Sequence, residues 1–211
     1  MSLFRRRRRN GAEIEAAPDR VLIVGLGNPG SRYAGTRHNV GWEVANELSR
    51  RWGLPRAKER FRGRIAEGRI RPDGPRVAIL LPQTYMNESG TSAGSARGQL
   101  KVPLERVLVL HDEIDLPFGE IRAKLGGGVA GHNGLKSLRE GLGSTDFWRL
   151  RIGVGRPDTT DPEIVSAHVL GRFSEPAEEV AALIDDAAGE AERLVEQVVE
   201  ETEDPIGEVI D

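Results

Sequence analysis

Two short motifs carry side chains that could move a proton. His38 lies in the run Thr36-Arg37-His38-Asn39, at the predicted start of a helix. The positive end of a helix dipole disfavours a protonated imidazole, so we expect a neutral His38 that can act as a base. Asp112 lies just after an apolar strand, and its carboxylate could orient a neighbouring imidazole and stabilise its charged form. The pair predicts acid–base chemistry, although each residue alone also fits an ordinary surface or loop position.

A glycine-rich loop follows the first apolar strand. The run GLGNPG at 25–30 fits the dinucleotide fingerprint G-x-G-x-x-G. However, Pro29 and Gly30 interrupt the chain where the phosphate-binding helix should begin. Glu43 and Glu47 lie inside the next helix, not at the end of a second strand as that fold requires. We therefore favour a ligand-binding loop at the carboxyl edge of a sheet, which presents the Asn28 amide, over a nicotinamide site.

A second glycine-rich loop contains three consecutive glycines at 126–128. Glycine loses much backbone entropy on folding, so this run indicates a mobile loop or close approach by a ligand. Asn133 is predicted to cap the helix that follows, and its N-terminus is a potential anion site. Lys124 and Lys136 flank this site. A flexible surface loop is the alternative.

A third segment follows the strand that Pro82 ends. Tyr85 offers a face on which a base or ribose could stack, and Asn87 offers a polar anchor. Met86 is expected in the core. Tyr85 could instead pack beneath the next helix.

A metal site is also conceivable. Ligand atoms could come from His111, Asp112, Asp115 and His132, but no recognised zinc spacing connects them. The absence of cysteine excludes Cys-ligated zinc, iron–sulfur clusters and a disulfide framework.

The apolar patterns predict the scaffold that positions these residues. Strands are expected at 21–24, 61–70, 77–81, 107–110, 121–125 and 150–154. Helices are expected at 36–52 and 87–100, from Asn133 towards Leu142, from Asp161, and after Ser174 with Pro176 in the first turn. This alternation predicts an α/β, single-domain layered fold with a mixed, largely parallel central sheet flanked by helices.

Length and charge divide the chain into three predicted parts. The 211 residues suffice for one domain with a sizeable core, expected at 20–199, between a basic disordered arm at 1–19 and an acidic tail at 200–211. Residues 175–211 hold 14 acidic residues and one basic residue, whereas 1–174 hold 29 basic and 19 acidic. A basic body suits a polyanionic partner such as nucleic acid.

The sequence also predicts where the protein works. It has no run of 18 apolar residues, and its basic start lacks the apolar stretch of a secretory signal. We expect a soluble, cytoplasmic protein with no membrane contact.

Four stretches together resemble the bacterial peptidyl-tRNA hydrolase family. They are LIVGLGNPGSRYAGTRHNVG, LPQTYMNESG, VLHDEIDLPFGEIRAKLGGGVAGHNGLKSL and FWRLRIGVGRP, and they span 22–157 in the family's order. The resemblance implies that 20–199 is a catalytic domain that cleaves the ester between a peptide and the 3′ end of tRNA. It further implies a monomer that needs no metal, no cofactor and no obligatory protein partner.

The resemblance also implies roles for individual residues. The catalytic histidine falls on His38, its supporting aspartate on Asp112, and the asparagine that helps to reject free aminoacyl-tRNA on Asn28. The residues expected to hold the acceptor end, the peptide or a tRNA phosphate are Tyr33, Tyr85, Asn87, Lys124, His132, Asn133 and Arg151, and Lys136 is added by its charge. A water, a base and an oxyanion donor suffice for ester hydrolysis, so we expect direct attack by water. A non-catalytic structured-RNA-binding protein on the same scaffold is the alternative.

Overall fold

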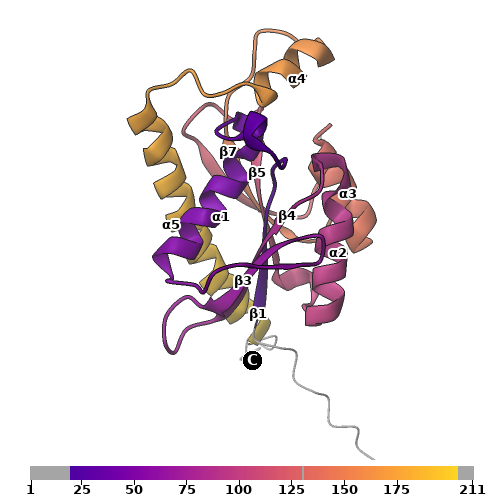
Figure 1. The fold of residues 1–211 in the computed structure, drawn as a ribbon, viewed down its shortest axis with the longest axis vertical. Coiled ribbons are helices and arrows are strands. Elements are labelled where there is room, and N and C mark those ends of the chain that lie inside the picture. The colour runs from indigo at the N-terminus through magenta and orange to yellow at the C-terminus, as the bar shows by residue number, and fades with distance from the viewer. Residues whose placement is uncertain (1–19, 130, 204–211) are drawn as a thin grey trace, which may run out of the picture.

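The computed structural model describes residues 20–129 and 131–203, and its centre is one seven-stranded sheet (Figure 1). The predicted arm at 1–19 and the tail beyond 203 lie outside the described residues. The strands are β1 Arg20–Gly25, β2 Lys58–Arg60, β3 Gly63–Arg69, β4 Arg76–Pro82, β5 Val107–Glu113, β6 Ile121–Leu125 and β7 Trp148–Gly153. Their order is β2-β3-β4-β1-β5-β7-β6. All six predicted strands are confirmed, and β2 was not predicted.

The sheet is mixed, as predicted. The central strands β4, β1, β5 and β7 pair in parallel. Strands β2 and β3 on one side and β6 on the other pair antiparallel with their neighbours. The parallel strands therefore end at one common edge, and this edge is where open α/β sheets bind ligands.

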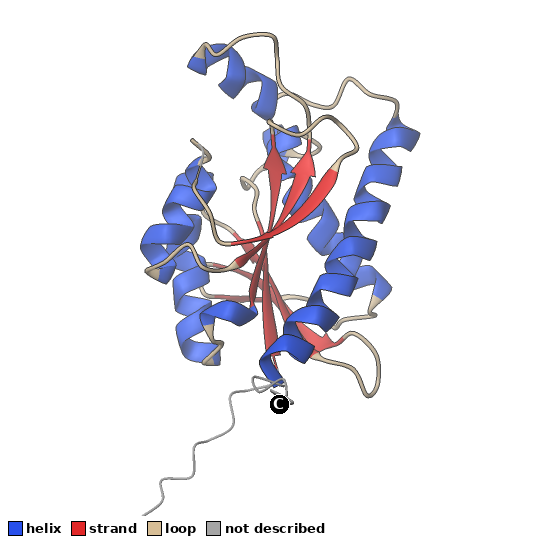
Figure 2. Cartoon of the chain, turned by 180° about the vertical axis from the view of Figure 1, so that it is seen from behind, coloured by secondary structure: helices blue, strands red, loops and turns tan. Residues whose placement is uncertain are grey.

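Helices cover both faces of the sheet (Figure 2). They are α1 Val40–Arg51, α2 Ser89–Leu100, α3 Asn133–Leu142, α4 Pro162–Leu170 and α5 Ala177–Glu203. One core cluster lies between α1, α5 and one sheet face, and a second lies between α2, α3 and the other. Successive residues of β1 show why two cores form, because Ile23 packs in the first cluster and Leu22 in the second. Helix α4 lies beyond the carboxyl ends of β5 and β7.

A close backbone contact brings the start of α1 against the central strands. A Cβ atom on Gly41 would lie 2.3 Å from the Leu110 carbonyl oxygen and 2.8 Å from the Leu26 carbonyl oxygen. Only glycine permits this approach. The contact places the 3-10 turn η2, Arg37–Asn39, beside the end of β5.

Three predicted helix boundaries are wrong in detail. The segment predicted as one helix at 36–52 divides into η2 and α1. Asn133 is the first residue of α3, and the capping side chain is that of His132. Helix α5 begins at Ala177, so Pro176 immediately precedes the helix and does not lie in its first turn as predicted. Among the described residues, no helix has both the length and the apolar character needed to cross a membrane.

Candidate active site

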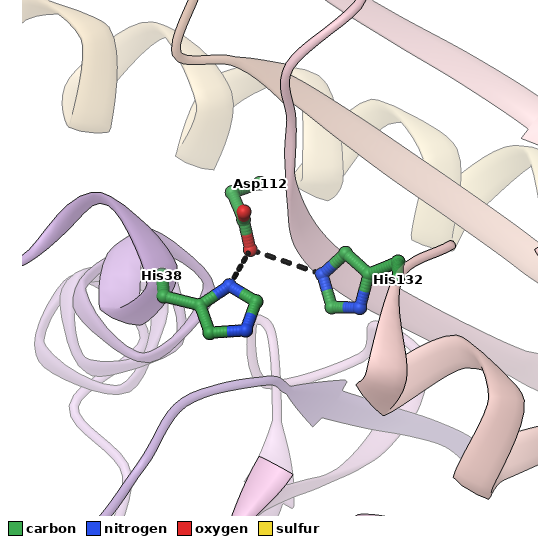
Figure 3. A group of neighbouring side chains, drawn as sticks. All are labelled: His38, Asp112 and His132. Atoms are coloured by element: carbon green, nitrogen blue, oxygen red, sulfur yellow. Dashed lines mark hydrogen bonds and ion pairs between the residues drawn. The ribbon is translucent and has the colours of Figure 1, made fainter. Parts of the chain in front are cut away.

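His38, Asp112 and His132 meet at the carboxyl edge of the sheet (Figure 3). His38 Nδ1 lies 2.8 Å from Asp112 Oδ1, and His132 Nε2 lies 3.0 Å from the same oxygen. The Asp112 side chain is 3% exposed, and each imidazole is 11% exposed. The three residues come from β5, from η2 and from the residue before α3, so the fold assembles them from distant parts of the sequence.

The hydrogen bond to Asp112 determines where the His38 proton sits. An ionised carboxylate only accepts hydrogen bonds, so His38 Nδ1 donates. In the neutral ring this leaves Nε2 unprotonated, and no described residue hydrogen-bonds to it. His38 therefore has one nitrogen held by a carboxylate and one available as a base.

Burial and the carboxylate act on the pKa of His38 in opposite directions. Burial lowers this pKa, but the charge of Asp112 and its hydrogen bond raise it above its usual value. The pKa of His38 is therefore raised, whereas the helix start was expected to keep the imidazole neutral. Burial would raise the pKa of Asp112, but the two histidines hold it well below its usual range. Asp112 is accordingly a carboxylate in the folded protein.

The Asn28 amide is oriented by the backbone around it. Its Oδ1 accepts from the Met86 backbone N–H at 2.8 Å. Asn39 fixes the loop itself, because its side chain accepts from the Asn28 N–H at 2.9 Å and donates to the Asn28 carbonyl at 3.0 Å. No described residue accepts from Asn28 Nδ2. The NH₂ group is therefore the part of this amide that can bind a ligand.

A cleft of about 910 Å³ surrounds these groups. All but one of the residues predicted to form the site line it, namely Asn28, Tyr33, His38, Tyr85, Asn87, Asp112, Lys124, His132, Asn133 and Arg151. The exception is Lys136, which is exposed on α3 outside the cleft. The side of the cleft formed by α4 presents Val165, Val169 and Leu170. These α4 residues were not predicted, because α4 buries none of its side chains and its sequence carries no distinguishing pattern.

Strands β6 and β7 contribute the basic side of the cleft. Lys124 pairs with Arg149 across the strands, and Arg151 lies two residues along on the same face. Arg151 Nε donates to Glu113 at 3.0 Å, which leaves its terminal nitrogens available. The sequence had indicated neither Glu113 nor Arg149 as site residues.

Arg149 holds the glycine loop in place. Its terminal nitrogens donate to the carbonyls of Gly128 at 2.6 Å and Gly127 at 2.8 Å. Burial, together with the neighbouring Arg151, lowers the pKa of Arg149. The guanidinium thus fixes the loop through backbone carbonyls.

The donor set does not favour a metal. Of the described residues, His38, Asp112 and His132 offer ligand atoms within 4.8 Å of one another. His132 Nδ1 accepts from the Gly134 and Leu135 amides, so a metal at Nε2 would require the ring proton to move onto the nitrogen that faces those amides. The other two candidate ligands have different partners: His111 Nδ1 donates to the Asp112 carbonyl at 2.7 Å, and Asp115 pairs with Arg156 at 2.8 Å.

Comparison with known proteins identifies the family. The family model described as peptidyl-tRNA hydrolase matches residues 22–207. The chain belongs to the peptidyl-tRNA hydrolase family. It is 50% identical over 153 residues to the peptidyl-tRNA hydrolase of Syntrophotalea carbinolica, covering 72% of this chain and 78% of that one. It is 49% identical over 176 residues to the peptidyl-tRNA hydrolase of Halorhodospira halophila, and this match covers 82% of this chain and 89% of that one.

A solved peptidyl-tRNA hydrolase has the same fold. The crystal structure of the Acinetobacter baumannii protein matches with a TM-score of 0.75 and 40% sequence identity, over 87% of this chain and 90% of that one. These findings confirm the resemblance found from the four sequence stretches and the predicted α/β class. In this member of the family, the glycine-rich loop after β1 leads into the short turn η1, Ser31–Tyr33, and not into a phosphate-binding helix. The dinucleotide interpretation therefore finds no support.

Proposed function

We propose that this protein hydrolyses the ester bond of peptidyl-tRNA and thereby releases tRNA from stalled or aborted translation. Membership of the peptidyl-tRNA hydrolase family supports the reaction. The single observation that carries the mechanism is the 2.8 Å contact between His38 Nδ1 and Asp112 Oδ1, which leaves His38 Nε2 available at the cleft.

In this mechanism His38 activates a water molecule. Nε2 takes a proton from the water as its oxygen bonds to the ester carbonyl carbon, and Asp112 stabilises the imidazolium that forms. When the tetrahedral intermediate collapses, the carbon–oxygen bond to the ribose breaks and Nε2 returns the proton to the departing 3′ oxygen. General acid–base catalysis of this kind contributes about 10²–10⁴-fold. The oxyanion donor is proposed to be Asn87, which is exposed at the cleft, or else Asn28 or a backbone N–H, and one such contact contributes about 3 kcal/mol.

Asn28 gives the enzyme its selectivity for a blocked amine. Its Nδ2 group donates to the carbonyl of the last peptide bond, while its Oδ1 is already occupied by Met86. A free aminoacyl-tRNA has an ammonium group at this place. That group offers no acceptor to Nδ2 and loses hydration on entering the cleft, so the substrate is disfavoured.

The cleft has separate sides for the two parts of the substrate. Lys124 and Arg151 bind a tRNA phosphate, and such contacts are largely indifferent to base sequence. The apolar side formed by α4 suits peptide side chains. Tyr33, Tyr85 and Asn133 also line the cleft, and they are proposed to contact the acceptor end or the peptide.

The enzyme is proposed to act in the cytoplasm as a monomer without an obligatory protein partner, metal or cofactor. The experiment that tests the proposed function incubates the protein with N-acetyl-aminoacyl-tRNA and with free aminoacyl-tRNA in EDTA. Rapid loss of the ester from the first substrate only is expected. Tight tRNA binding without ester cleavage would instead favour the non-catalytic RNA-binding alternative. Light scattering after gel filtration tests the monomer.

A further inference from the structure

Both nitrogens of His132 already have partners within the protein. Nδ1 lies 3.1 Å from the Gly134 backbone nitrogen and 3.4 Å from that of Leu135, at the start of α3. Nε2 lies 3.0 Å from Asp112 Oδ1. The imidazole therefore bridges the first turn of a helix and the carboxylate that supports His38 (Figure 3).

These partners determine the tautomer of His132. Backbone amides only donate, so Nδ1 must accept and carries no proton. The neutral ring then has its proton on Nε2, which donates to Asp112. Asp112 Oδ1 thus receives two hydrogen bonds, one from each histidine. His132 has no ring nitrogen left for the substrate, unlike the substrate-binding role expected from the sequence.

We infer that His132 is a positioning residue that acts through Asp112. It holds the carboxylate towards His38, and its hydrogen bond stabilises part of the negative charge of that carboxylate. This inference rests on the proposed function of His38. A carboxylate that accepts a hydrogen bond from His132 attracts the His38 proton less strongly than one that is free. His132 therefore limits how tightly His38 retains its proton, and this keeps more of the base in its active, unprotonated form near neutral pH.

Apart from His38, His132 is the described residue that hydrogen-bonds to the Asp112 carboxylate. His111, on the same strand, has its ring centroid 5.1 Å from that of His132. Burial, together with His132, lowers the pKa of His111 to about 3, so His111 stays neutral. The other charged groups that line the cleft are Glu113 on β5, Lys124 on β6, Arg149 and Arg151 on β7, and Arg156 after β7. Arg37, next to His38 in η2, donates to the Arg172 carbonyl and to the side chains of Ser174 and Glu175. None of these six hydrogen-bonds to the Asp112 carboxylate.

Two variants separate the two contacts of His132. In His132→Asn the short amide can still cap α3, because asparagine is a favoured capping residue, but it is too short to replace the Nε2 donor. In His132→Gln the longer amide can donate to Asp112 but is a poor cap. The pH profile of kcat/KM with N-acetyl-aminoacyl-tRNA is measured for both, alongside the melting temperature.

We expect His132→Asn to move the acidic limb of the profile upward by about half to one pH unit, since Asp112 then attracts the His38 proton more strongly. We expect kcat to fall about tenfold and KM to change less than twofold. His132→Gln should restore the position of the limb while lowering the melting temperature. An acidic limb at the wild-type position in His132→Asn, with the loss confined to KM, would overturn the inference in favour of a substrate contact.

A measurement without substrate separates this inference from the proposed function. Two-bond ¹H–¹⁵N correlation spectra of the wild-type protein report which nitrogen of each neutral histidine carries the proton. We expect the Nε2–H tautomer for His132 and the Nδ1–H tautomer for His38. Finding Nδ1–H at His132 would overturn the inference even if the enzyme is active. Absence of ester cleavage by the wild-type protein would instead overturn the proposed function, with the tautomer unaffected.

Discussion

The Met86 backbone N–H donates to Oδ1 of Asn28 at 2.8 Å, and this single bond determines which end of the Asn28 amide faces the cleft. Asn28 lies in the loop after β1, and Met86 begins the 3-10 turn η3, Met86–Glu88, after β4; strands β1 and β4 pair in parallel. Sheet pairing thus brings a backbone donor to the side chain that we propose as the selectivity determinant.

Asn28→Asp tests this selectivity. The carboxylate retains an oxygen that can accept from Met86 but replaces the NH₂ donor with a second acceptor. We expect kcat/KM for N-acetyl-aminoacyl-tRNA to fall by about 10–100-fold, the equivalent of one buried hydrogen bond. Cleavage of free aminoacyl-tRNA should fall less or rise, because a carboxylate attracts an ammonium. An unchanged ratio of the two rates would remove Asn28 from substrate discrimination.

Asp112→Asn tests the charge of the supporting residue. Burial lowers the pKa of His38 and the carboxylate raises it, so removal of the charge leaves burial as the main influence. The acidic limb of kcat/KM should therefore move to lower pH, opposite to the shift expected for His132→Asn. The maximal rate should fall by about 10²-fold or more, because the imidazolium loses its counter-ion. If the acidic limb of the kcat/KM profile stayed at the wild-type pH in Asp112→Asn, His38 would not be the titrating group.

His111 supplies a prediction about acid stability. Burial lowers its pKa to about 3, whereas in the unfolded chain the group titrates near its usual value of about 6.5. Between these values the unfolded chain binds more protons, so the free energy of unfolding falls as the pH falls. The slope from one such group approaches about 1.4 kcal/mol per pH unit.

Urea unfolding of the wild-type protein and of His111→Asn between pH 7 and pH 4 measures this contribution. Asparagine is chosen as the replacement because its side-chain amide can still donate to the Asp112 carbonyl and does not titrate. The wild-type protein should lose stability faster on acidification than the variant. Two parallel curves would mean that His111 titrates normally in the folded protein.

The proposed phosphate contacts of Lys124 and Arg151 predict how tRNA affinity depends on salt concentration. If each contacts a tRNA phosphate, Lys124→Ala or Arg151→Ala should make the slope of log affinity against log salt shallower by about one unit. Lys58→Ala is the matched control, since Lys58 is exposed on β2, at the opposite edge of the sheet from β6. Equal slopes for Lys124→Ala and Lys58→Ala would place the RNA elsewhere.

The sequence predicts the scaffold well where burial alone decides the structure. Val21 and its apolar neighbours form a strand covered on both faces, and such a run needs no knowledge of its partners to be recognised. The proximity of His38 and Asp112 could be anticipated as well, because parallel strands end at one edge and the motif resembles that of a known family. Family membership then follows from the same stretches.

The contacts of individual polar side chains could not be predicted in this way. His132 and Asn133 are adjacent, and only the direction of each side chain decides that the histidine caps α3. Arg149 and Arg151 alternate on one strand and look equivalent in sequence, yet one binds loop carbonyls and the other Glu113. The choices at Arg149 and Arg151 depend on residues more than 20 positions away.

The most direct measurement of the central claim is the single-turnover rate of His38→Asn with N-acetyl-aminoacyl-tRNA in EDTA. We expect the rate to fall by about 10²–10⁴-fold, with tRNA affinity and melting temperature close to those of the wild-type protein. A folded variant that binds tRNA and cleaves the ester at the wild-type rate would contradict the assignment of His38 as the base.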